Sequence, residues 1–178
     1  MKNSGVRVLS MLLVAMGVIG FGLTSVGCGS TAYKKFTVDV SLDSTQNAGQ
    51  PVTVDLVALG GDRAAELDAM PMRKYWTQND PYRQSLLSQG VLWTVELSEA
   101  NPTATLGARD KIWNTPTWKS GGKLFVLAEL RGVGPGPNGD PRRRSILREA
   151  NLWDQSKIAV TVRPSGISYS PTEKAVAR

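Results

Sequence analysis

A two-residue alternation of apolar and polar side chains recurs along the chain and limits the folds open to it. The alternation runs through residues 36–42, 52–58, 91–97 and 157–163. Strands direct successive side chains to opposite faces, so this period predicts strands with one buried and one solvated face. Residues 123–130 are apolar almost throughout and predict a central strand that is buried on both faces. Weaker strand candidates are residues 103–106, 110–113, 143–148 and 167–170.

Residues 62–89 break this alternation and have the composition of helices. Asp62 is a candidate N-cap, Pro71 interrupts the pattern, and Asp80 followed by Pro81 is a typical helix start. We therefore expect two short helices after the second strand. Seven or so short strands separated by turn residues are typical of a β-sandwich. The predicted fold is mainly β: a small β-sandwich of two antiparallel sheets with a short helical insert at about 62–89.

The first 27 residues are typical of an export signal. Lys2 and Arg7 give a positive start, and residues 8–23 carry no charge. A small residue directly before Cys28, the only cysteine, is similar to the lipobox of bacterial lipoproteins, although Ser25 stands where Leu is usual. We expect a signal peptide over 1–27 and an acylated (palmitate-type) cysteine at position 28. An ordinary signal peptide, or an uncleaved anchor with a bystander cysteine, is the alternative.

Lipidation at Cys28 would place the protein at a membrane. Several acyl chains on one residue give stable attachment, and Gly29 rather than Asp after the cysteine favours the outer membrane in the usual sorting rule. We expect residues 28–35 to form a lipidated tether reaching at most about 25 Å, and residues 36–178 to form one domain on the periplasmic face. Loss of residues 1–27 leaves 151 residues and a net charge of +4, enough chain for a core without a disulfide.

The composition excludes several kinds of catalytic and metal site. The chain has no His and one Cys, which excludes a Ser-His-Asp triad, an HExxH zinc site and a multi-cysteine metal site. Asp39 and Asp55 fall on the polar faces of their strands, where we expect water to solvate them. The Gly/Pro-rich segment 132–141 predicts a loop and not a phosphate cradle, because Pro offers no N–H group. We expect no catalytic residue, no metal and no cofactor, and a protein that is not an enzyme.

Two other groups of residues are candidate binding residues. Trp113 and Trp118 flank a loop-rich segment and could stack on sugars, or could pack in the core. Arg142, Arg143 and Arg144 form a basic cluster that could contact anionic lipid or an acidic partner, or could be a solvated flank of the neighbouring loop. Nucleic acid is not expected as a partner of an exported protein of modest charge.

The lipobox, short tether and small sandwich together resemble the TssJ family, the outer-membrane lipoproteins of type VI secretion systems. The resemblance is one of pattern over nearly the whole mature chain. It lies in a Pro-Val strand at 51–59, an aromatic-bearing helical stretch at 67–76, an apolar strand ending in Ala-x-x-Arg at 124–131 and a final hairpin at 158–170. The loop 132–141 departs from it, because it is longer and richer in Gly and Pro than the family leads one to expect.

The resemblance implies an adaptor that tethers a secretion complex to the outer membrane by binding the periplasmic part of an inner-membrane partner. In the family, the loop between the first two strands takes part in that contact. Here this loop is residues 43–50, with a polar tip of Ser44, Thr45, Gln46 and Asn47. The alternative hypothesis is a lipoprotein module that binds carbohydrate or peptidoglycan through exposed Trp113 or Trp118.

Overall fold

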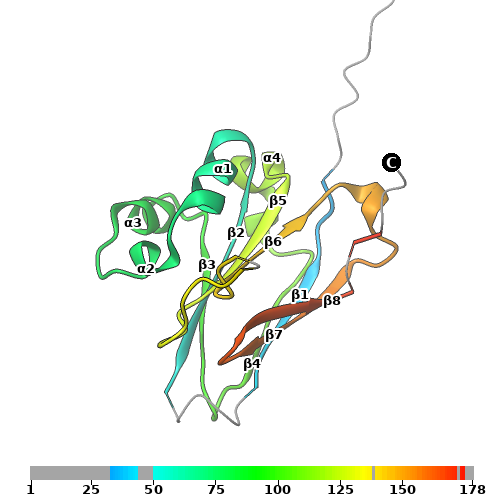
Figure 1. The fold of residues 1–178 in the computed structure, drawn as a ribbon. Helices are drawn as coiled ribbons and strands as arrows, with labels where there is room; N and C mark the ends of the chain where they lie inside the picture. Colours follow the sequence, from blue (N-terminus) through cyan, green and yellow to red (C-terminus); the bar gives the residue numbers. More distant parts are fainter. Residues whose placement is uncertain (1–32, 44–49, 138, 172, 175–178) are drawn as a thin grey trace, which may run out of the picture. The chain divides into compact units, whose positions relative to one another are not determined.

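A computed structural model describes residues 33–43, 50–137, 139–171 and 173–174. These residues belong to one compact unit, Thr31–Arg178, which contains two four-stranded sheets and one continuous apolar core. Figure 1 shows the two sheets as two layers, with the helices beside one of them. The expected small β-sandwich is confirmed. No helix in the described part of the chain is long and apolar enough to span a membrane.

The first sheet has the order β4-β1-β7-β8. Its strands are β1 (Thr37–Leu42), β4 (Thr103–Leu106), β7 (Lys157–Arg163) and β8 (Gly166–Ser170). The expected hairpin closes the fold, since β7 and β8 are antiparallel, with Val162 opposite Ile167. Strands β1 and β7, in contrast, pair in parallel, with Val38 opposite Ile158. Parallel pairing needs a long connection between the two strands, and here the connection includes all four strands of the second sheet.

The second sheet has the order β3-β2-β5-β6, and its neighbouring strands are antiparallel. Its strands are β2 (Val52–Leu59), β3 (Trp93–Leu97), β5 (Lys123–Ala128) and β6 (Arg143–Leu147). Residues 124–128 of β5 are all buried, as the apolar run predicts. Trp93 lies opposite Leu56 and is half-buried, because β3 is an edge strand.

Three helices, rather than two, lie between β2 and β3. They are α1 (Gly61–Ala69), α2 (Met72–Tyr75) and α3 (Pro81–Ser88). Asp80 is the N-cap of α3, and its carboxylate accepts the N–H groups of Tyr82 at 3.0 Å and Arg83 at 3.1 Å. Asp62 is not the cap of α1, because that helix starts after Gly60 and Asp62 lies in its first turn.

The expected strand at 110–113 is wrong. Asp110 caps a 3-10 helix, η2 (Lys111–Asn114), by accepting the N–H group of Ile112 at 2.9 Å. Helix α4 (Pro116–Ser120) follows after one residue, and a further 3-10 helix, η3 (Ala150–Leu152), precedes β7. A short Asx turn here competes with strand pairing.

Tyr33 and Lys34, just before the expected domain start at residue 36, are bonded to the sandwich. Tyr33 forms a bridge with Glu149, and the N–H group of Lys34 donates to the carbonyl of Arg148 at 2.8 Å. The buried Arg148 side chain donates in return to the carbonyls of Lys34, Trp118 and Gly121. Burial lowers the pKa of Arg148 to about 10, which leaves it a cation at neutral pH.

Asp55 is fully buried, contrary to the expectation that water solvates it. It points to the outer face of β2, and the helical insert covers that face. Its carboxylate accepts the Tyr75 hydroxyl at 2.9 Å, the Arg83 guanidinium at 2.7 Å and the Thr94 hydroxyl at 2.7 Å. One carboxylate thereby joins β2 to helices α2 and α3 and to strand β3.

We predict that Asp55→Ala destabilises the unit by about 3–5 kcal/mol, because it leaves a half-buried guanidinium and two hydroxyls without their acceptor. The matched control is Asp39→Ala. Asp39 lies at a similar place on β1, but its ion pair with Lys157 is largely exposed, so its loss should cost less than about 1 kcal/mol. Urea unfolding of residues 31–178 measures both. Equal losses for the two variants would contradict this role of Asp55 in holding the insert.

Candidate functional site

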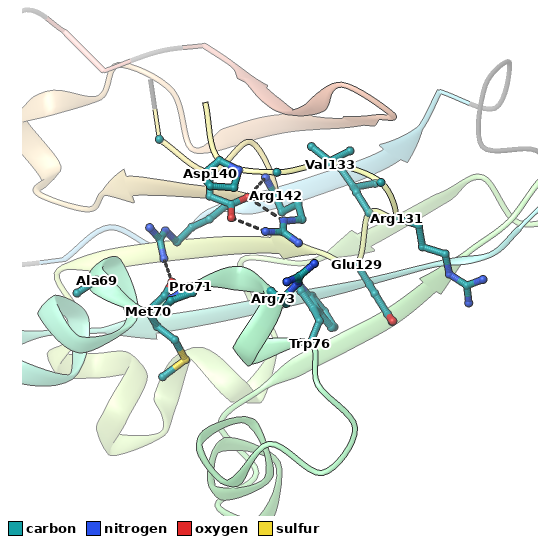
Figure 2. A pocket seen from close by; sticks show the side chains of 16 residues that line it. Ala69, Met70, Pro71, Arg73, Trp76, Glu129, Arg131, Val133, Asp140 and Arg142 are labelled. Atoms are coloured by element: carbon teal, nitrogen blue, oxygen red, sulfur yellow. Dashed lines mark hydrogen bonds and ion pairs between the residues drawn. The ribbon is translucent and has the colours of Figure 1, made fainter. Parts of the chain in front are cut away.

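A groove of about 1050 Å³ lies between the helical insert and the segment that follows β5. The end of α1 and helix α2 form one wall, and residues 129–135 and 139–143 form the other (Figure 2). Its apolar surface comes from both walls, with Met70, Pro71 and Trp76 on one side and Leu130 and Val133 on the other. The groove is larger than a second hollow of about 610 Å³ that lies beside Tyr33 and α1.

Asp140 and Arg142 form a nearly buried ion pair in the second wall. The guanidinium of Arg142 donates to the carboxylate at 2.6 and 2.9 Å, and its backbone N–H adds a bond of 3.0 Å. Burial acts to raise the pKa of Asp140, but the bonds from Arg142 outweigh it and hold that pKa below its ordinary value. The pair fixes the end of the Gly/Pro-rich loop to the start of β6.

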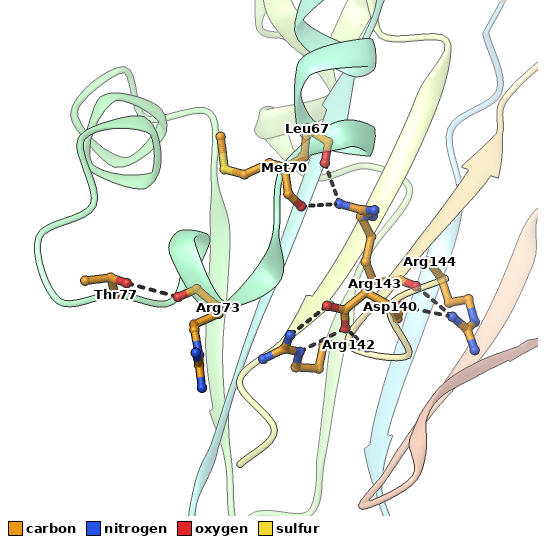
Figure 3. Close-up of polar contacts among 8 residues, drawn as sticks. All are labelled: Leu67, Met70, Arg73, Thr77, Asp140, Arg142, Arg143 and Arg144. Carbon is orange, nitrogen blue, oxygen red and sulfur yellow. Dashed lines mark hydrogen bonds and ion pairs between the residues drawn. The ribbon is translucent and has the colours of Figure 1, made fainter. Parts of the chain in front are cut away.

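Arg143 ties the two walls together. Its guanidinium donates to the carbonyls of Leu67 at 2.6 Å and Met70 at 2.8 Å (Figure 3). These carbonyls lie at the C-terminal end of α1, where helix carbonyls need donors from elsewhere and a cation is favoured. Arg144 donates to the carbonyl of Arg143 at 2.8 Å. The guanidinium groups of Arg142, Arg143 and Arg144 are therefore bonded within the protein. Arg142 is buried, so the interpretation as a solvated flank is wrong for that residue.

Two other cations in the groove have no partner among the described residues. Arg73 is exposed on α2, and Arg131 is exposed on the opposite wall. In Figure 2, Glu129 lies between them, and its carboxylate has no bond within the described chain either. The six charged residues that line the groove are Arg73, Arg131, Arg142, Arg143, Glu129 and Asp140, four positive and two negative.

Trp76 is the aromatic residue of the groove. Its ring packs edge-on against Tyr75 with centroids 5.0 Å apart, and the guanidinium of Arg83 lies 5.0 Å from its centre. The indole Nε1 is buried and finds no acceptor among the described residues. An unmet buried N–H costs about 1–3 kcal/mol, so an acceptor brought by a ligand or water would be favourable here.

Trp113 and Trp118 cannot form the sugar-stacking platform that the alternative hypothesis requires. Both are fully buried, and they pack edge-to-face with centroids 4.7 Å apart. The Trp118 indole donates to the carbonyl of Val91 at 2.6 Å, and the Trp113 indole to that of Gly107 at 2.9 Å. The helical turns of residues 111–120 direct both rings inward, which a loop-rich composition does not reveal.

Cys28 and the loop tip of Ser44, Thr45, Gln46 and Asn47 lie outside the described residues. The roles expected of them stay predictions. Within the described chain, no three acidic, Cys or His side chains gather closely enough to hold a metal ion.

We predict that Asp140→Asn lowers stability at about pH 7 and that its effect shrinks in acid. A carboxyl whose pKa is depressed in the folded state contributes stability above its ordinary pKa of 3.8, and that stability is lost as the pH falls through the lowered value. Urea unfolding of the unit and the variant at about pH 7 and about pH 2.5 measures the difference. A stability gap that stays constant across this range would contradict the assignment.

The sequence matches no protein-family model and no curated protein. Among solved structures, it is similar to a type VI membrane complex, with 13% identity over 78% of this chain and 99% of that chain and a TM-score of 0.48. A second similar structure is Serratia marcescens Lip, a membrane-bound component of the type VI secretion system. The identity is 18% over 76% of this chain and 98% of that chain, with a TM-score of 0.46. The chain is also similar to the Pseudomonas aeruginosa lipoprotein TssJ1. The identity is 13% over 80% of this chain and 99% of that chain, with a TM-score of 0.40.

At these identities and TM-scores, the function has to follow from the residues of this chain.

Proposed function

We propose that this protein is a lipid-anchored adaptor on the periplasmic face of the outer membrane, which holds a type VI secretion-like envelope complex there by binding a periplasmic domain of an inner-membrane partner. The observation that carries the proposal is the groove, an open hollow with apolar walls and unpaired cations on a compact sandwich. The lipobox-like residues before Cys28 support the anchor. The resemblance of the strand and helix pattern to the TssJ family supports the choice of partner.

The distance from the anchor to the fold suits such a role. Tyr33 and Lys34 are bonded to the sandwich, and Tyr33 is the fifth residue after Cys28, with four residues between them. An extended chain of this length spans at most about 18 Å. The proposed adaptor therefore stays within a domain's width of the membrane surface, and an attached complex would be held there.

A carbohydrate- or peptidoglycan-binding module is not favoured by the geometry. That alternative relied on exposed Trp113 and Trp118, and both rings are inside the core. The groove offers Trp76 as an aromatic surface, but no second aromatic ring is among its described lining residues, and the carboxylate of Asp140 is already paired with Arg142.

We predict that Cys28→Ser releases the protein from membranes, because it removes the only thiol that could carry the acyl chains. Fractionation of cells, together with incorporation of labelled palmitate, measures the anchor. Ser30→Ala is the matched control, since it changes a neighbouring residue and should leave both readouts intact. Membrane retention or palmitate labelling of Cys28→Ser would contradict the anchor.

We predict that the full chain, tagged at its C-terminus and extracted from cross-linked cells in mild detergent, retains a periplasmic domain of an inner-membrane protein. Mass spectrometry identifies what is retained. Cys28→Ser should retain less of it, because the untethered protein loses the high local concentration near the envelope complex. Retention of glycan without any envelope protein would contradict the adaptor role.

A further inference from the structure

We propose that the groove between α2 and residues 129–143 is a docking site for an extended acidic segment of a partner protein. The segment would present carboxylates to Arg73 and Arg131 and an apolar side chain to the groove walls between them. This inference rests on the proposed function for the presence of a protein partner. It adds the surface and the chemistry of the contact, which neither the sequence pattern nor the polar loop tip of residues 44–47 indicates.

The charges of the groove favour an acidic occupant. Four of the six charged lining residues are cations, and two of them, Arg142 and Arg143, are fixed by bonds within the walls. Arg73 and Arg131 remain without partners among the described residues, on opposite walls. An extended strand that lies along the groove can bring separate carboxylates to both guanidinium groups, each as a charge-assisted pair.

The backbone of the second wall favours an extended segment over a compact ligand. Gly132 and Gly134 line the groove, and their N–H groups have no acceptor in the described chain. Neither residue has a side chain to hold a partner backbone away, and a Cβ added at either position would meet nothing within 4 Å. Main-chain carbonyls of an incoming strand can therefore approach these donors directly.

The floor of the groove favours an apolar or aromatic side chain between the carboxylates. Met70, Pro71, Leu130 and Val133 supply aliphatic surface on both walls, and Trp76 supplies a ring. The unmet Nε1 of Trp76 adds a donor that is buried at the wall.

The shape and the two acids argue against an anionic membrane as the occupant. Figure 2 shows the Arg131 side chain directed away from Arg73, so an occupant that contacts both cations has to extend along the groove. Glu129 and Asp140 line the same hollow and would repel phosphate groups packed side by side. A single strand avoids this repulsion, because its acidic and apolar side chains can be spaced to match the walls.

The first experiment measures the affinity of residues 31–178 for fluorescent poly(Glu,Tyr). We expect Arg73→Glu with Arg131→Glu to weaken binding by at least about tenfold, since both contacts become repulsive. The matched control is Lys74→Glu with Arg109→Glu. It makes the same change in net charge at two cations outside the groove and should change the affinity by less than about twofold. Equal weakening in both double variants would overturn the proposal, because it would mean attraction by net charge alone.

The indole N–H resonances provide a second readout that does not depend on charge. Assigned with a Trp76→Phe variant, the Trp76 signal should shift on addition of poly(Glu,Tyr), while the signal of the buried Trp118 stays in place. A Trp76 signal that does not move at saturation would overturn docking in the groove. Binding to phosphatidylglycerol vesicles that is lost in the groove variant, without binding to the peptide, would assign the groove to lipid and also overturn it.

The same variants separate this inference from the proposed function. If the wild-type chain retains its envelope partner from cells and the groove double variant retains it equally, the docking site is wrong and the adaptor role stands. If the wild-type chain retains no envelope protein, the adaptor role itself fails. Loss of the partner from the groove variant, with retention by the Lys74/Arg109 control, supports both.

Discussion

The buried ion pair between Asp55 and Arg83 is the interaction on which the functional surface depends. A carboxylate inside a protein is tolerated only when its oxygens are fully bonded, and Asp55 gains its donors from Tyr75, Arg83 and Thr94. Those donors belong to two helices and a neighbouring strand. The need to satisfy one charge therefore fixes the insert on the outer face of the second sheet, and that position makes helix α2 a wall of the groove.

The opposite wall is held by a second set of charges. Asp140 and Arg142 fasten the loop to β6, and Arg143 reaches across to the last carbonyls of α1. A Gly/Pro-rich segment would otherwise have many conformations. With its C-terminal end bonded in this way, it can form a defined rim and still offer backbone donors at Gly132 and Gly134. Arg142 and Arg143 hold the walls and are already bonded within the protein. Arg73 and Arg131 have no partner among the described residues and can bind one.

The alternation of residues predicts most of the sandwich because a strand's pattern depends on which face is buried. It predicts β1, β2, β5, β7 and β8 closely, and the Asp80-Pro81 start of α3. It fails at Asp55, because a polar face covered by an insert has the same local pattern as one that faces water. It fails at residues 110–113, where a 3-10 helix forms in place of a strand. It leaves open whether Trp113 and Trp118 stack on a ligand or pack in the core, where the structure places them. The groove cannot be predicted from local patterns, since Trp76 and Arg131 are 55 residues apart in sequence and only tertiary packing brings them to one hollow.

An anchored sandwich that takes its partner in the groove beside α2 should cross-link to that partner from the groove and not from elsewhere on its surface. Site-specific photocross-linking in intact cells measures this, with a photoreactive residue placed at Pro135 in the groove or at Arg109 outside it. We predict one cross-linked envelope protein from position 135, which disappears in the Cys28→Ser background and is absent from position 109. The same cross-links from both positions, or none from position 135, would contradict docking in the groove.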